Sequence, residues 1–268
     1  YKEAITGYLF DTGRLWCSVV GLSASVTDVS ALDAQLLKVG YRQGGKKLND
    51  IPVYYSNDNK TVTLIDNVSS TGVYFVRYYD YSQPFLTPYM AWDAPMSDVG
   101  TVMAKDDYVQ VQQGMGSDGY YISYYGKRLE EISVYHFSRE GKLQETDVFL
   151  DPVIVPFDKA CNYLTSSLSF SKSIYLFSNY GEVYESRDGN TVALVLEPYY
   201  TTSKMVQIAF MSKASAIAGA SGSSRNATRS GMSGTIQPDH LKGLPDGLLE
   251  RAKEHSPDIY ERELRQSY

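Results

Sequence analysis

The chain has 268 residues, of which 43% are hydrophobic and 21% are charged, and its net charge is −6. This length suits one large domain or two small ones, and the acidic balance argues against nucleic acid as a direct, sequence-specific partner and against binding to anionic lipid. No run of about 18 apolar residues is present, so we expect no membrane span.

Short strands separated by turns fill most of the chain up to residue 213. Hairpin-type turns lie at Asp118-Gly119, Glu140-Gly141 and Asp188-Gly189. Strand patterns cover residues 8–10, 14–20, 51–55, 60–66, 73–79, 108–112, 120–125, 132–138, 143–150, 173–177, 182–185, 191–197 and 205–211. This spacing predicts an all-β body over residues 1–213, an antiparallel sandwich of jelly-roll or immunoglobulin-like type, with a possible sub-boundary near 81–105.

One or two short helices are expected to interrupt the strands. Residues 28–39 predict a helix, because Asp28 can cap it, Leu32 and Leu36 share a face, and Gly40 can end it. Residues 157–168 predict a shorter helix or a loop.

The composition changes after Met211. Residues 214–237 are rich in Ala, Gly and Ser and predict a flexible linker. Residues 238–268 predict a helical C-terminal arm whose apolar faces are too small to fold alone, so we expect the arm to pack on another surface. The assembly contacts expected of this arm are Leu248, Leu249, Ile259, Tyr260 and Leu264.

Two segments resemble turns or strand pairs of known folds. Residues 61–80 resemble part of an immunoglobulin-like or fibronectin-type sandwich, which implies two adjacent strands with Tyr74 near the corner. Residues 186–191 resemble the Asp-box turn of sialidase-type propellers, but are one residue shorter and occur once. The alternative for residues 186–191 is an ordinary hairpin turn.

No residue set matches a catalytic or metal-binding signature. Gly-x-Ser-x-Gly is absent, and His136, His240 and His255 lie far apart in the sequence. Cys17 and Cys161 are expected to be buried free thiols, with a single bridge between them as the alternative. We therefore predict a non-enzymatic protein with no catalytic residue, no metal and no cofactor.

An aromatic segment at residues 78–93 is the most unusual feature. Its prolines keep it extended. Exposed, the segment could contact a partner or stack on a glycan receptor; the alternative is that it covers one end of the core. The candidate contact residues are Tyr81, Phe85, Tyr89, Trp92 and Asp93.

Tyrosine is frequent, with 24 copies, and suits interfaces because its ring packs while its hydroxyl stays hydrated. Together with the predicted arm, this favours a structural or assembly subunit, such as a viral capsid-type or appendage protein, that binds other copies or sister subunits. The chain begins with Tyr1, which predicts a processed product, and residues 84–89 are similar to a strand end of picorna-like capsid proteins. A virion or extracellular location is favoured over the cytoplasm, and a carbohydrate-binding or glycan-active protein is the alternative.

Overall fold

The computed structural model describes residues 4–11, 13–25, 28–46, 51–68, 72–104, 108–116, 118–126, 129, 131–223, 234–236, 244–248 and 250–251. Contacts within the chain divide it into two units between Pro84 and Phe85, and we call them unit 1 and unit 2. This division falls inside the 81–105 range indicated by the sequence. Both units consist mainly of antiparallel strands, so the predicted all-β class is confirmed, with a six-stranded sheet in unit 1 and an eight-stranded sheet in unit 2.

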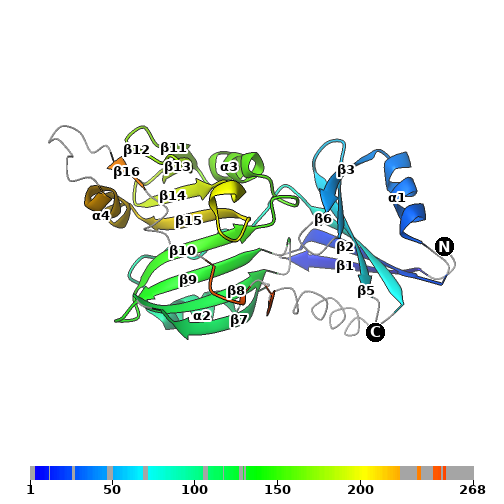
Figure 1. Cartoon of the computed structure of the whole chain (residues 1–268). Coiled ribbons are helices and arrows are strands. Elements are labelled where there is room, and N and C mark those ends of the chain that lie inside the picture. Colours follow the sequence, from blue (N-terminus) through cyan, green and yellow to red (C-terminus); the bar gives the residue numbers. More distant parts are fainter. Residues whose placement is uncertain are drawn as a thin grey trace. The chain divides into compact units, whose positions relative to one another are not determined.

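Unit 1 is one six-stranded antiparallel sheet with a helix on one face (Figure 1). The helix forms where the sequence predicts it, because the Asp28 carboxylate accepts a hydrogen bond from the Ala31 N–H at 2.7 Å and Leu32 and Leu36 pack on the sheet. The sheet order is β1-β2-β6-β5-β4-β3. In chain order the elements are β1 (Ala4–Asp11), β2 (Arg14–Ser23), α1 (Val29–Lys38), β3 (Tyr41–Lys46), β4 (Pro52–Ser56), β5 (Thr61–Val68) and β6 (Val73–Asp80).

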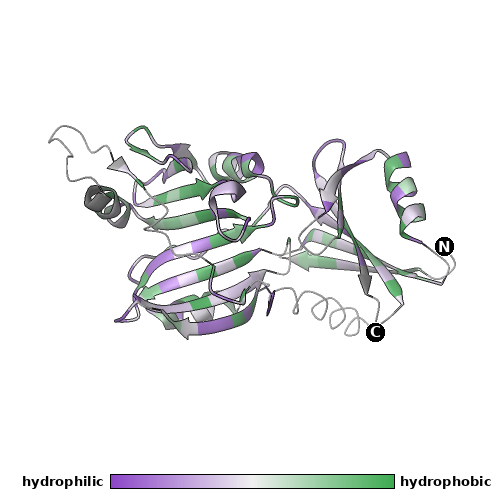
Figure 2. Cartoon of the chain, in the orientation of Figure 1, coloured by the Kyte–Doolittle hydropathy of each residue, from purple (hydrophilic) through white to green (hydrophobic). Residues whose placement is uncertain are grey.

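Unit 2 contains an eight-stranded sheet in the order β11-β13-β14-β15-β10-β9-β8-β7 and a small parallel pair, β12-β16. Its central strands β14 and β15 are hydrophobic along most of their length, as strands buried on both faces must be (Figure 2). The elements are α2 (Met96–Met103), β7 (Tyr108–Met115), β8 (Gly119–Gly126), β9 (Ile132–Ser138), β10 (Leu143–Leu150), α3 (Phe157–Ser166), β11 (Phe170–Lys172), β12 (Leu176–Phe177), β13 (Gly181–Ser186), β14 (Thr191–Leu196), η1 (Pro198–Tyr200), β15 (Val206–Ser212), α4 (Lys213–Ser223) and β16 (Gly234–Thr235).

Two helices, α2 and α4, lie where the sequence predicted none. Helix α4 occupies the first part of the expected linker, and its residues Ala216 and Ala220, one turn apart, are buried. The linker prediction is therefore corrected for residues 214–223. Residues 224–233 and 252–268, which include most of the expected arm, lie outside the described residues.

Unit 1 and part of unit 2 have the same order of elements. In unit 1 the hairpin β1–β2 is followed by α1 and then by the four strands β3 to β6, of which the last, β6, pairs with β2. In unit 2 the hairpin β9–β10 is followed by α3 and then by the sheet strands β11, β13, β14 and β15, of which the last, β15, pairs with β10. The orders β1-β2-β6-β5-β4-β3 and β9-β10-β15-β14-β13-β11 therefore correspond strand by strand.

The turn between β4 and β5 has a specific hydrogen-bond pattern. The Ser56 hydroxyl donates to the Asp58 carboxylate at 2.7 Å, and the Lys60 N–H donates to the same oxygen at 3.1 Å. The Thr61 N–H donates to the Ser56 hydroxyl at 3.0 Å. One serine and one aspartate thus satisfy two backbone donors of the turn.

The corresponding turn between β13 and β14 repeats this pattern. The Ser186 hydroxyl donates to Asp188 at 2.5 Å, the Asn190 N–H donates to Asp188 at 3.1 Å, and the Thr191 N–H donates to Ser186 at 2.9 Å. The pattern Ser-x-Asp-x-x-Thr therefore occurs twice and not once. It forms an ordinary hairpin turn in each unit, in agreement with the alternative offered for residues 186–191.

The two hairpins also share an irregularity of register. In unit 1 the register shifts so that Phe10 lies opposite Leu15, and in unit 2 it shifts so that Phe137 lies opposite Leu143. A bulge re-aims side chains and disrupts pairing, so its presence at the same place in both hairpins is a specific correspondence.

We call two residues equivalent when they occupy the same place in these matched registers. Further equivalent pairs with identical residues are Tyr8 and Tyr135, Val20 and Val148, Leu22 and Leu150, Val53 and Val183, Tyr54 and Tyr184, Val62 and Val192, and Leu64 and Leu194. The chain therefore contains an internal repeat, and unit 2 adds α2, β7 and β8 ahead of its copy.

Candidate functional site

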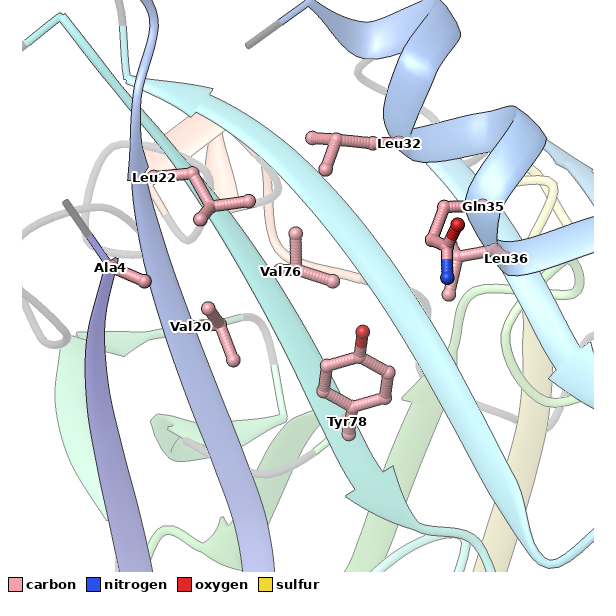
Figure 3. Close-up of a pocket in the computed structure, with 8 residues that line it drawn as sticks. All are labelled: Ala4, Val20, Leu22, Leu32, Gln35, Leu36, Val76 and Tyr78. Atoms are coloured by element: carbon pink, nitrogen blue, oxygen red, sulfur yellow. The ribbon is translucent and has the colours of Figure 1, made fainter. Parts of the chain in front are cut away.

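Helix α1 and the sheet of unit 1 line a partly open apolar cavity of about 170 Å³, which we call the unit 1 groove. Figure 3 shows helix side chains on one side of it and strand side chains on the other. The lining residues are Ala4, Val20, Leu22, Leu32, Gln35, Leu36, Val76 and Tyr78. The groove is large enough for one aromatic ring, since a cavity of about 150 Å³ with an apolar lining holds benzene.

The sequence builds both walls of the groove through simple periodicities. Val20 and Leu22 are two positions apart in β2, and the strand period of two places both on the same face. Val20 lies opposite Val76 of the neighbouring strand β6. Leu32 and Leu36 are one helical turn apart and face these strands from α1.

The groove carries no charge among its lining residues and has two polar groups, the Gln35 amide and the Tyr78 hydroxyl. Burial, followed by the nearby Tyr41, raises the pKa of Tyr78 above its ordinary value of 10.0. The rings of Tyr41 and Tyr78 make an edge-to-face contact, with centroids 6.2 Å apart. The Tyr78 hydroxyl therefore stays protonated near neutral pH, and the groove suits an uncharged, largely apolar group.

Three large hydrophobic side chains of the β1–β2 hairpin are exposed: Tyr8 by 60%, Phe10 by 61% and Leu15 by 42%. Tyr8 is four positions from the lining residue Ala4 in β1, so strand alternation places both on the same face of the sheet. A tyrosine exposed on the face that carries an apolar groove extends that groove into a larger apolar surface.

The equivalents of these three residues in unit 2 are fully covered. Helix α2 lies over them through Val99 and Met103, and residues 89–96 pack against the same cluster. The equivalents Tyr135, Phe137 and Leu143 are exposed by 0%, 0% and 1%. The same residue types in the same places of the same fold are thus buried in one unit and exposed in the other.

The predicted contact residues are distributed over both units and mostly face inward. Tyr81 is buried in unit 1, where its ring lies 5.7 Å from that of Tyr55, and Phe85 is buried in unit 2. The expectation that these two rings form an exposed contact surface is therefore wrong, because each is enclosed by the packing of its own unit.

The other three residues of the aromatic segment also belong to unit 2. Tyr89 and Trp92 are half-buried against the cluster under α2, and the Trp92 Nε1–H donates to the Thr191 hydroxyl at 3.1 Å. Asp93 is exposed and has a positive φ of 63°. The segment thus covers the core, as the alternative from the sequence held, and offers no open aromatic platform for a sugar ring.

Of the predicted arm residues, Leu248 is within the described part of the chain and is buried. Leu249, Ile259, Tyr260 and Leu264 lie outside the part whose side chains are described. Cys17 and Cys161 are both buried and are not joined by a disulfide bond, as expected.

A hydrogen-bonded cluster of polar side chains lies inside unit 2. His136 Nε2 lies 3.0 Å from Asp147 Oδ2, and the Gln207 side-chain amide donates to Asp147 Oδ1 at 3.0 Å. All three side chains are buried, so the group connects β9, β10 and β15 in the interior and is inaccessible to a large ligand.

Within the described residues, no group of three or more His, Cys, Asp or Glu side chains could hold a metal ion. None of the helices in this part of the chain combines the length and hydrophobicity that crossing a membrane requires. No protein-family model and no curated protein matches this sequence.

The groove residues were not among the site residues predicted from the sequence. Val20, Leu22 and Val76 appear as ordinary core positions, because alternation reports which face a residue occupies and not whether that face is covered. The signal that could have found this surface is the internal repeat, through the motifs Tyr-x-Phe and Ser-x-Asp-x-x-Thr that occur in both halves.

Proposed function

We propose that this chain is a non-enzymatic assembly subunit that docks onto another polypeptide, a copy of itself or a sister subunit, through the unit 1 groove and the adjacent side chains. The observation that carries this proposal is the exposure of Tyr8, Phe10 and Leu15 beside the groove. Exposed apolar surface of this kind marks interaction sites, and aromatic residues are enriched in the buried centre of interfaces. A capsid-type or appendage subunit would be one form of this function.

The energetic scale of this surface suits association. Full burial of a side chain such as Phe10 or Leu15 contributes about 1.5–3 kcal/mol. Association costs about 4–15 kcal/mol in lost rigid-body freedom. Three such side chains together with a filled groove therefore offset a substantial part of that cost.

The test is the native mass of the tagged full chain isolated from the cells that produce it. We expect a mass above that of the monomer for the native chain and a fall to the monomer mass for Tyr8→Ser/Phe10→Ser. Ile174→Ser is the matched control, because Ile174 is exposed by 84% in unit 2, and it should leave the mass unchanged. A native chain of monomer mass, or a double variant that keeps the higher mass, would contradict the proposal.

A further inference from the structure

We propose that the unit 1 groove binds an extended segment of a sister subunit that carries two aromatic residues four positions apart, the first of which fills the groove. This inference rests on the proposed function in taking the groove as a docking surface, and it adds the chemistry of the docked segment. The evidence is the way in which unit 2 fills its own equivalent groove with residues 85–89.

The first aromatic residue of that filling segment is Phe85. Its ring packs edge-to-face on Tyr163 of α3, with centroids 4.9 Å apart. Tyr163 is the equivalent of the lining residue Gln35 of α1, by the alignment of the two ten-residue helices. Phe85 therefore occupies, in unit 2, the helix side of the groove, which no described residue fills in unit 1.

The next residue reaches the opposite wall. The Leu86 N–H donates to Glu131 Oε1 at 3.1 Å. Glu131 precedes β9 and continues its register with β10, which makes it the equivalent of Ala4, the lining residue contributed by β1. Residues 85–86 thus span the equivalent groove from α3 to the start of β9.

The second aromatic residue, Tyr89, lies over the hairpin. Its N–H donates to the Tyr135 hydroxyl at 3.2 Å, and its carbonyl accepts a hydrogen bond from the Thr146 hydroxyl at 3.3 Å. The equivalents of these two partners in unit 1 are Tyr8 and Ser18, which carry the same hydroxyl groups. Unit 1 therefore presents both hydroxyls that hold such a backbone in unit 2.

The contacts that residues 85–89 already make within unit 2 indicate which chain supplies the docked segment. Phe85 is exposed by 0% in unit 2, so the first ring of this segment is buried and unavailable in a second copy of this chain. The prolines at positions 84 and 88 keep the segment extended, and an extended, preorganised peptide loses little conformational entropy on binding. A sister subunit with a free segment of this chemistry is the partner that the groove fits.

The experiment uses a fluorescently labelled synthetic peptide with the sequence of residues 83–91, Gln-Pro-Phe-Leu-Thr-Pro-Tyr-Met-Ala, titrated into the full chain and followed by anisotropy. We expect saturable binding that weakens about tenfold or more when the phenylalanine and tyrosine of the peptide are both replaced by alanine, since ring burial supplies most of the attraction. A photoreactive analogue at the phenylalanine should cross-link to β1, β2, β6 or α1.

Three variants of the full chain locate the site. Val20→Trp fills the groove and should abolish binding, with folding checked by circular dichroism. Tyr8→Phe removes one hydroxyl and should weaken binding severalfold in a chain that folds normally. Leu37→Ala is the matched control, because Leu37 neighbours Leu36 in α1 but is exposed and does not line the groove.

The outcomes separate this inference from the proposed function. Absence of peptide binding, equal binding of the alanine-substituted peptide, or cross-links confined to unit 2 would overturn the inference even if the native mass is high. A native mass that is a whole multiple of this chain alone and falls to the monomer mass in Tyr8→Ser/Phe10→Ser would show a second copy on the surface and would also overturn it. Saturable peptide binding by a chain of monomer mass would support the groove and contradict the assembly role.

Discussion

At the scale of single residues, burial in this protein is set by the surroundings and not by residue type. Tyr8 and Tyr135 are the same residue at equivalent positions, yet the first is largely exposed and the second is inaccessible. Phe10 and Phe137 differ in the same way. A hydrophobic residue in a strand pattern therefore indicates which face of the sheet it lies on, but not whether another part of the molecule covers that face.

The buried ion pair of unit 1 leads to a prediction about stability, and the equivalent positions of unit 2 show which residues can replace it. Arg77 Nη2 lies 2.6 Å from Asp66 Oδ2, and the equivalent positions in unit 2 are Ala209 and Leu196. We expect Arg77→Ala to lower the free energy of unfolding by about 3–5 kcal/mol, because the Asp66 carboxylate is left buried without this cation. Arg77→Ala with Asp66→Leu should cost much less, since it reproduces the apolar pair of unit 2. Urea denaturation of both variants checks this, and equal losses would contradict it.

The repeated turn gives a prediction about pH. The hydrogen bond from Ser56, and then that from the Lys60 N–H, lower the pKa of Asp58 below its ordinary value of 3.8. A depressed pKa means that the ionised carboxylate stabilises the folded turn above pH 3.8, and that this contribution is lost as the pH falls through the lowered pKa. Ser56→Ala should therefore raise the pKa of Asp58.

An NMR titration of the side-chain carboxyl groups measures this shift directly. Asp188 is the internal control, because Ser186 lowers its pKa in the same way in unit 2 and is unchanged in the variant. A Ser56→Ala chain in which both carboxyl groups titrate as before would show that the serine hydroxyl does not set the pKa of Asp58.

At the scale of elements, the sequence predicts those whose signals are local. Helix α1 was predicted because a cap, an apolar spacing and a terminating glycine lie within thirteen consecutive residues, 28–40. Helix α4 was missed because its small residues are typical of linkers, although Ala216 and Ala220 provide the narrow face that packs on unit 2. Helix α2 was missed because it is short, contains a glycine and has no side-chain cap at its N-terminus.

The edges of the two sheets are a feature that local sequence signals do not predict. In unit 2 the outer edge of β9 pairs antiparallel with β8, whereas among the described residues no strand pairs with the outer edge of its equivalent β1. An unpaired edge is a template for another strand. Strand order depends on pairings distant in the sequence, so a strand pattern alone does not distinguish an edge from an interior strand.

At the scale of the whole molecule, the repeat explains why the candidate site was not found from the sequence. The sequence singled out the aromatic segment at residues 78–93, either as a surface that binds a partner or a glycan or as a cover over one end of the core. Its residues 85–89 pack inside unit 2, whereas no residue that the structure describes fills the equivalent groove of unit 1. The segment and the groove of unit 1 are related only through the correspondence between the two units. Among the described residues, unit 1 has no counterpart of the residues 85–89 that pack in unit 2.

The two tryptophans provide a way to follow each unit. Trp16 is buried in unit 1, stacked on Tyr79 with ring centroids 6.2 Å apart, and Trp92 lies in unit 2. Trp92→Phe leaves fluorescence from unit 1, and Trp16→Phe leaves fluorescence from unit 2. Both substitutions keep an aromatic ring, so each variant should report the unfolding of one unit in an otherwise native chain.

The peptide of residues 83–91 should then stabilise one unit and leave the other unchanged. A ligand at about a hundred times its Kd stabilises the folded state by about 2.7 kcal/mol, and about 1 kcal/mol moves the Tm of a unit of this size by about 4–8 °C. We therefore expect the Trp16 transition of Trp92→Phe to rise by about 10 °C or more with the peptide, while the Trp92 transition of Trp16→Phe stays in place, because the groove of unit 2 is already filled by its own covalently attached segment. If instead the Trp92 transition rises, the added peptide is competing for unit 2, and the open groove of unit 1 is not its site.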